Sequence, residues 1–182
     1  MQKINYVPLH QHTTFSIGDG YGYPKDLMDY CESIGLPACA ITDHGNMSAL
    51  AWQFQHQKEM EKAGKSFKSI YGIEAYYIDD IDDWKRDYDE YMASKKNKED
   101  DDDELSVDEG LSVGVSSKFN IKERAHIVLL AMNDVGLKNL FSLASNSSTD
   151  KYFYKYPRID FELLKKHNEG INSGVFIEIF IG

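Results

Sequence analysis

Short apolar runs and longer amphipathic segments alternate along the chain. The apolar runs are of strand length, whereas the longer segments repeat their apolar residues at the helical spacing of three to four. Strands are predicted at residues 4–10, 37–42, 69–78, 126–132 and 174–182, and helices at residues 24–35, 47–64, 133–146 and 160–170. This alternation predicts an α/β fold with a largely parallel sheet, either open or closed into a barrel.

Two of the predicted strands end in side chains that can do chemistry. His10 and His12 close the first strand, and Asp43 and His44 follow the second. Reactive loops of α/β folds gather at the carboxyl ends of the strands. We therefore expect these four side chains to lie on one rim of the sheet.

Further candidate ligands accompany the two histidines. A His-x-His pair on an extended segment points both imidazoles to the same side. Mixed histidine and carboxylate ligands suit zinc, manganese or iron, whereas calcium prefers oxygen alone. The candidates exceed what one tetrahedral ion needs, so a cluster of two or three divalent ions is predicted, of the kind that serves phosphoryl transfer. The predicted metal ligands are His10, His12, Asp19, His44, Glu74 and His126.

Other readings of single residues stay open. A lone His-x-His pair is a weak signal, and a polar residue at a turn often only caps a helix or satisfies a backbone amide. His56 lies inside an amphipathic segment and is predicted to face solvent rather than bind a ligand. His167 lies near the end of a predicted helix, where its side chain is expected to interact favourably with the helix dipole. The metal prediction therefore depends on the co-occurrence of several candidates at successive strand ends.

The net charge of −10 comes from one segment. Residues 79–109 contain 15 acidic and 5 basic residues, which is a net charge of −10, so the rest of the chain is neutral. Such a charge block is usually solvated or disordered. We predict an acidic, flexible insert at about residues 79–118, and the remaining chain is compatible with a phosphate-bearing ligand.

Cysteine usage and hydropathy favour a cytoplasmic protein without a membrane partner. Cys31 and Cys39 have neither disulfide-framework nor zinc-finger spacing, so both are expected to be reduced and buried. The start of the chain does not resemble a signal peptide, and no apolar run is long enough to span a membrane.

Five stretches of the sequence occur in an order that resembles a known family. They are LHQHTTFSIGDG, AITDHGNMSAL, YGIEAYY, AHIVLLAMNDVGLKNLFSLAS and YPRIDFELLKKHNEG. Together they closely resemble the PHP (polymerase and histidinol phosphatase) domain at the start of bacterial and phage DNA polymerase III alpha subunits. The resemblance covers nearly the whole chain except the acidic insert. AMNDVGLKNLFSLAS and PRIDFELL favour the polymerase branch over stand-alone PHP phosphatases.

The resemblance implies one PHP domain over residues 1–182, with a distorted (β/α)7-type barrel and a trinuclear zinc or manganese centre. It implies metal-dependent phosphoesterase chemistry through metal-bound hydroxide, which in polymerase versions is 3′–5′ exonuclease proofreading on DNA. The six ligands above match family positions, and Asp43 matches a neighbour that supports the ligands or occasionally serves as one. Asp43 and His44 are the predicted catalytic residues. The implied partners are a DNA 3′ end and the remaining polymerase III alpha domains or the replisome.

Two departures from the family pattern lead to an alternative. The family continues into a strand bearing a cysteine ligand and later an Asp-x-His pair, neither of which is found here, so we expect a C-terminally incomplete barrel with an open seam. The apolar residues 174–182 could then pair with a second copy by strand exchange. The alternative function is a truncated or degenerate scaffold that docks to the polymerase without catalysis. A small-molecule phosphatase of the histidinol-phosphate type is a third hypothesis.

Overall fold

A computed structural model describes residues 6–96 and 124–179 of the chain. Three of its helices begin at residues suited to helix starts. Pro24 occupies the first turn of the first helix, Asn133 accepts a hydrogen bond from the Gly136 amide, and Asp160 accepts one from the Leu163 amide. The helices are α1 (Pro24–Ser33), α2 (Leu50–Lys62), α3 (Ile81–Lys96), α4 (Asp134–Ser147) and α5 (Phe161–Lys166).

The strands form a mixed sheet rather than the largely parallel one expected from the sequence. They are β1 (Ala38–Ile41), β2 (Lys68–Tyr77), β3 (Ala125–Ala131), β4 (Phe153–Tyr154), β5 (Tyr156–Ile159) and β6 (Ile171–Ile179). The order is β4-β5-β2-β3-β6, with β1 paired to β2 beside this path. β1 and β5 run parallel to β2, whereas β3 runs antiparallel to both β2 and β6. The fold is therefore mixed α/β.

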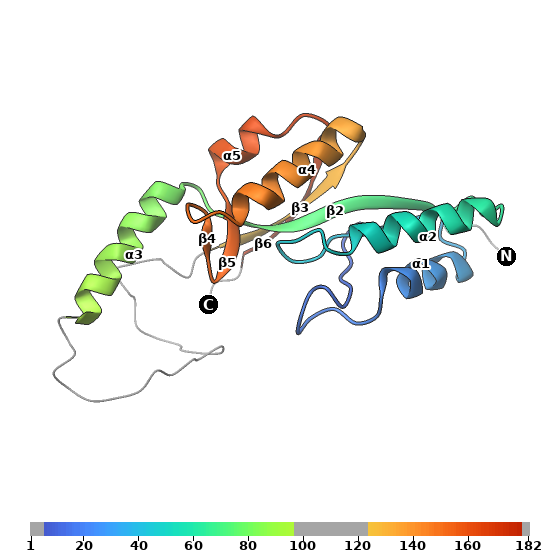
Figure 1. Cartoon of the computed structure of the whole chain (residues 1–182), viewed down its shortest axis with the longest axis horizontal. Helices are drawn as coiled ribbons and strands as arrows, with labels where there is room; N and C mark the ends of the chain where they lie inside the picture. Colours follow the sequence, from blue (N-terminus) through green and yellow to red (C-terminus); the bar gives the residue numbers. More distant parts are fainter. Residues whose placement is uncertain (1–5, 97–123, 180–182) are drawn as a thin grey trace.

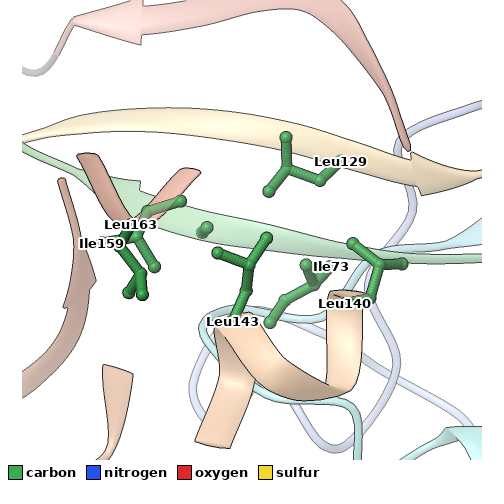
Figure 2. Close-up of a cluster of buried hydrophobic side chains, with 7 residues drawn as sticks. Ile73, Leu129, Leu140, Leu143, Ile159 and Leu163 are labelled. Carbon is green, nitrogen blue, oxygen red and sulfur yellow. The ribbon is translucent and has the colours of Figure 1, made fainter. Parts of the chain in front are cut away.

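The main hydrophobic core lies between the sheet and α4. Successive side chains of a strand point to opposite faces, so Ile73 and Ala75 of β2 face α4 while Glu74 faces away. Leu140 and Leu143 of α4 fill the space above these strands (Figures 1 and 2). The buried members of this core are Ile73, Ala75, Leu129, Leu140, Leu143, Ile159 and Leu163.

The first two helices pack against each other, and α1 also packs against β1 while α2 packs against β2 (Figure 1). Met28 and Cys31 of α1 meet Met60 of α2 and Cys39 of β1 in a second core. Both cysteines are free and buried, and burial beside Cys31 raises the pKa of the Cys39 thiol. The expectation of reduced, buried cysteines is thus confirmed in this structure.

Part of the predicted flexible insert is a packed helix. α3 covers residues 81–96, and Ile81 and Trp84 on its inner face are buried against Ile78 and Tyr154. The prediction of a flexible segment is therefore wrong for this part, because apolar residues at helical spacing hold it to the domain. Residues 97–118 of the predicted insert lie outside the described residues.

Both ends of the chain differ from the predicted strands. Residues 6–10 lie beside β1, with Pro8 O accepting from the Ala40 amide at 2.9 Å, but they do not form a regular strand. The last strand begins at Ile171, three residues before its predicted start, and pairs with β3. Within the described residues the sheet ends at β4 and β6 without closing into a barrel. Exchange of the last strand between copies stays a prediction.

Candidate metal centre

Glu74 occupies the point on β2 where one neighbouring strand leaves and another joins. β1 pairs with β2 as far as Tyr71, and β5 pairs with it from Tyr76 onward. Between them, the Glu74 amide donates to Asp43 O at 3.1 Å, and Glu74 O accepts from the Gly45 amide at 2.7 Å. The segment after β1 is thus fixed alongside Glu74, with His44 forming a bridge to it.

Four imidazoles surround the carboxylate of Glu74, which is only 2% exposed. Its Oε2 lies 2.7 Å from His44 Nδ1, 3.1 Å from His12 Nε2 and 3.3 Å from His10 Nε2. Its Oε1 lies 2.9 Å from His126 Nδ1. Because β3 runs antiparallel to β2, the beginning of β3 brings His126 to the end of β2 that carries Glu74. The carboxylate of Glu74 therefore connects β2 with three segments that are distant in sequence. They carry His10 and His12, His44, and His126.

Asp19 adds a second, exposed carboxylate to this cluster. Its Oδ2 lies 3.1 Å from His44 Nε2 and 3.9 Å from His12 Nε2. The six residues form three overlapping groups, each with donor atoms close enough together to hold one ion. The groups are His10–His12–Glu74, His12–Asp19–His44 and His44–Glu74–His126.

A buried hydrogen-bond network fixes the loop that carries the first ligands. Asp43 is 1% exposed, and its carboxylate accepts from the Thr13 amide at 2.7 Å, from Thr13 Oγ1 at 2.8 Å and from Ser16 Oγ at 2.6 Å. Ser16 Oγ also lies 2.9 Å from His12 Nδ1 and accepts from the His44 amide at 3.1 Å. This network connects the loop of Asp19 to His12 and to Asp43 and His44, which follow β1.

The tight course of this loop depends on Gly20. A Cβ atom at Gly20 would lie 1.8 Å from Thr13 O, so no other residue fits this backbone. The Gly20 and Asp19 amides both donate to Ser16 O, at 2.8 and 3.0 Å. The loop therefore turns back on itself and brings Asp19 next to His44.

The cluster shifts the pKa values of Glu74 and His44. Burial raises the pKa of the Glu74 carboxyl, but hydrogen bonds from His12, His126 and His44 outweigh it and hold that pKa well below the ordinary value of 4.5. The hydrogen bond to Glu74 raises the pKa of His44 above 6.5 against the effect of burial, and Asp19 adds to the increase. The contact between Glu74 and His44 thus favours a charged carboxylate beside a protonated imidazole.

The arrangement fits divalent metal ions. Glu74 Oε2 is buried, and nitrogens of three imidazoles converge on it. His10 Nε2 and His12 Nε2 face each other at 3.0 Å. Ligands about 2.0 Å from a tetrahedral ion lie roughly 3.3 Å from one another, similar to the distances found here. Nitrogen with carboxylate oxygen is the donor set of zinc, manganese and iron.

The family model of the PHP domain matches residues 8–178. The chain belongs to the PHP domain family. The match includes all six predicted ligands and extends across α3 to β6.

Relatives of this PHP domain include DNA polymerase III alpha subunits. The chain is 31% identical to the subunit of Aquifex aeolicus over 167 residues, which is 92% of this chain and 12% of that protein. It is 32% identical to the subunit of Deinococcus radiodurans over 174 residues, 93% of this chain and 11% of that protein. The chain is thus homologous to the N-terminal PHP region of these subunits and spans about a tenth of their length.

Solved structures resemble the domain only in part. A candidate metal-dependent phosphoesterase from Bifidobacterium adolescentis has a TM-score of 0.41 at 18% identity, covering 78% of this chain and 32% of that one. An amidohydrolase from Chromobacterium violaceum has a TM-score of 0.37 at 13% identity, covering 88% and 48%.

The PHP domain brings together all six residues predicted as ligands. It places Asp43 behind them as a supporting group, and it places His56 differently from expectation. Asp43 points into the loop network, and its oxygens are occupied by Thr13 and Ser16. His56 is buried rather than solvated, with Nε2 2.8 Å from Asp29 Oδ1 and Nδ1 3.1 Å from Glu59 Oε2. The prediction for His56 is wrong because its partner Asp29 comes from α1.

His167 is half-buried at the end of α5, where burial and the neighbouring Lys166 lower its pKa. A favourable interaction of a charged His167 with the helix dipole is therefore opposed by its surroundings. No helix in the described part of the PHP domain is both long and apolar enough to cross a membrane.

Two kinds of functional residue were missed from the sequence. Ser16 connects His12, Asp43 and the His44 backbone, yet a serine in a loop carries no distinguishing pattern. Tyr76 lies two residues after Glu74 on the same face, and its ring stacks on His44 with centroids 5.9 Å apart. The period of two in a strand could have indicated Tyr76 as a neighbour of the cluster.

Proposed function

We propose that this PHP domain is a metal-dependent phosphoesterase that hydrolyses DNA from its 3′ end, as the 3′–5′ exonuclease module of a DNA polymerase III alpha-type protein. The observation that carries the proposal is the buried Glu74 carboxylate surrounded by four imidazoles. Asp43 shows the contrast, because this buried carboxylate is satisfied by an amide and two hydroxyls and contacts no imidazole. Relatives named DNA polymerase III subunit alpha support DNA as the substrate.

The three overlapping ligand groups are suited to two or three Zn²⁺, Mn²⁺ or Fe ions. His12, His44 and Glu74 each belong to two groups, whereas His10, Asp19 and His126 each belong to one, so neighbouring ion positions would share these residues as candidates. When bound, such ions activate water at neutral pH and stabilise the charge of a reacting phosphate. The protein residues hold the positions, and the exposed Asp19 is on the side from which substrate can enter.

Asp43 and His44, the predicted catalytic pair, have separate tasks in this proposal. His44 contacts Glu74 and Asp19 through its two ring nitrogens and thus lies at the centre of the cluster. Asp43 orients the loop of His12 and Asp19 through Thr13 and Ser16 and acts as a positioning residue. The substrate partner is a DNA 3′ end, the protein partners are the remaining polymerase domains, and a cytoplasmic location is expected.

Metal content and nuclease activity test the proposal together. Protein dialysed against metal-free buffer is loaded with Zn²⁺ or Mn²⁺, analysed for ions per chain and assayed on a 3′-labelled DNA oligonucleotide. We expect about two or three ions per chain and metal-dependent release of the terminal nucleotide. The double variant His12→Ala/His44→Ala should lose both, whereas Lys58→Ala, an exposed change on α2, should retain both.

Two outcomes would contradict the proposal. Nuclease activity retained by the double variant would identify a contaminant as its source. A folded wild-type protein that binds no ion would instead favour the alternative, a scaffold that docks to a polymerase. Circular dichroism of each variant separates loss of metal from loss of fold.

A further inference from the structure

A row of side chains extends from the cluster across the sheet. Tyr76 of β2 is paired with His126 of β3 on one side and with Arg158 of β5 on the other. Directly opposed residues of neighbouring strands project to the same face, which here is the face of Glu74. Arg124, two residues before His126, projects to this face as well. The row therefore brings two arginines close to the imidazoles.

The Arg124 guanidinium lies between two tyrosine rings. Its carbon is 4.3 Å from the centroid of Tyr156 and 5.5 Å from that of Tyr76. The Tyr76 ring in turn lies 4.8 Å from the His126 ring. Among the described residues no carboxylate pairs with Arg124, and its Nε is buried without a hydrogen-bond partner. Stacking on aromatic rings fixes the guanidinium plane, and the N–H donors in that plane need an acceptor.

Arg158 adds a second positive charge beside Arg124. It is 3% exposed, lies 4.2 Å from the Trp84 ring centroid and donates from Nη1 to Tyr156 O at 3.1 Å. Its Nε is also buried without a partner. Burial and the charge of Arg124 lower its pKa to about 10. Aromatic rings and carbonyl oxygens partly stabilise these two neighbouring cations, and an anion bound beside them would offset their mutual repulsion.

We propose that Arg124, supported by Arg158, binds the substrate phosphate next to the one that reacts at the cluster. The proposal rests on the proposed function, since it assumes a nucleic-acid strand at the cluster. Arginine binds phosphate through two parallel N–H donors. Because the Tyr76 ring contacts Arg124 as well as the imidazoles of His44 and His126, the guanidinium is one ring away from the cluster. Because Tyr76 separates Arg124 from the imidazoles, the guanidinium suits a phosphate that flanks the reacting one.

Equilibrium binding tests this assignment without catalysis. Fluorescence anisotropy of a labelled single-stranded DNA oligonucleotide is measured with the full chain in EDTA at several salt concentrations. Arg124→Gln should weaken binding about tenfold. It should also reduce the slope of log K against log salt concentration (the salt slope) by about 0.7 in magnitude, as expected for one lost phosphate contact. Arg124→Lys should restore the slope but only part of the affinity, because an ammonium keeps the charge without the planar donors.

Arg86→Gln is the matched control. Arg86 is an exposed arginine of α3 that pairs with Asp83 at 2.8 Å, and its loss should leave affinity and slope unchanged. Equal affinity and slope for Arg124→Gln and wild type would overturn the assignment. An equal loss in Arg86→Gln would overturn it as well, because the effect would then reflect net charge alone.

Kinetics separate this inference from the proposed function. In the metal-loaded protein, Arg124→Gln should raise the KM for the oligonucleotide about tenfold, with kcat and metal content unchanged. Hydrolysis of bis(4-nitrophenyl) phosphate, which has a single phosphate, should not change. Equal losses on both substrates would overturn the assignment to a flanking phosphate. If the wild type hydrolyses neither substrate, the proposed function fails, and the anisotropy series still decides whether Arg124 binds phosphate.

Discussion

Ser16 Oγ donates a 2.6 Å hydrogen bond to Asp43 Oδ1, and both residues are 1% exposed. Through this contact a loop after the first ligand pair is joined to the end of β1. The same hydroxyl lies 2.9 Å from His12 Nδ1, so it also fixes the orientation of an imidazole whose other nitrogen faces Glu74. Groups that orient metal-binding histidines in this way tune metal affinity without touching the ion.

Replacing this hydroxyl should weaken metal binding. We expect Ser16→Ala to lower the affinity for Zn²⁺ or Mn²⁺ about 10–100-fold, as measured by titration calorimetry. The free energy of unfolding should fall by about 1.5–3 kcal/mol, because a buried hydrogen bond to a carboxylate is lost. Ser33→Ala is the control, since Ser33 Oγ donates to Tyr30 O on the surface. Unchanged metal affinity in Ser16→Ala would show that the loop holds its shape without this contact.

The cluster predicts opposite pH dependences for the metal-free and metal-bound states. The raised pKa of His44 contributes stability that is complete below pH 6.5 and is lost as pH rises through the folded-state pKa. The lowered pKa of Glu74 contributes stability that is complete above pH 4.5 and is lost as pH falls through its folded-state pKa. Both contributions are present between these two values, so the metal-free protein should be less stable at pH 8 than at pH 6.

Metal reverses this trend because ions bind deprotonated imidazoles. Thermal unfolding is followed at pH 6, 7 and 8 in EDTA and with excess Zn²⁺ or Mn²⁺. The Tm should fall with pH in EDTA, and the increase in Tm on adding metal should grow with pH. His167→Gln is a suitable control, since the pKa of His167 is lowered and its removal cannot cause the fall. A metal-induced increase that shrinks toward pH 8 would contradict imidazole ligation.

Gly45 is predicted to resist substitution more than Gly64, although both have positive φ. It has φ of 60°, and a Cβ there would lie 2.5 Å from Pro157 Cγ of β5. Gly64 has φ of 73°, but a Cβ would meet nothing within 4 Å. Gly64→Ala should therefore cost about 1–2 kcal/mol through backbone strain alone. Gly45→Ala should cost about 1–3 kcal/mol more and reduce metal content, because β5 and the adjacent His44 must move.

Urea unfolding of both variants measures this difference, and elemental analysis gives the ions per chain. Similar losses of stability for Gly45→Ala and Gly64→Ala would mean that β5 shifts without cost. The contact between Gly45 and Pro157 would then have no role in holding the site.

Local periodicity predicted most helices and the interior strands, but strand direction depends on pairing. The apolar run of β3 is the same in either direction, so its antiparallel alignment could not be predicted from periodicity alone. That alignment explains why His126 begins its strand yet reaches Glu74. The six candidate ligands could be predicted because histidines and carboxylates recur in and beside successive predicted strands. Ser16 and Arg124 were missed because their roles depend on contacts between distant segments.

The acidic segment shows how composition can conceal a helix. Ile81, Trp84 and Tyr88 are spaced three and four residues apart, which is the apolar pattern of a helix face. The surrounding aspartates lower the mean hydropathy and led to a prediction of flexibility. Three apolar residues were enough to hold α3 because Tyr154 and Arg158 provide a surface for them.

Trp84 should accordingly be a main contact that holds α3 to the domain. It is 9% exposed, stacks on Tyr88 with centroids 5.4 Å apart and lies beneath the Arg158 guanidinium. Trp84→Ala should lower the free energy of unfolding by about 3–5 kcal/mol, as for other buried aromatic residues. Trp52→Ala is the matched control, because Trp52 is 55% exposed and its loss should cost less than about 1 kcal/mol. Equal effects of the two changes, measured by urea unfolding, would mean that α3 contributes little to the stability of the domain. If Trp84→Ala also weakened oligonucleotide binding, α3 would be supporting Arg158 and, through it, the proposed phosphate contact of Arg124.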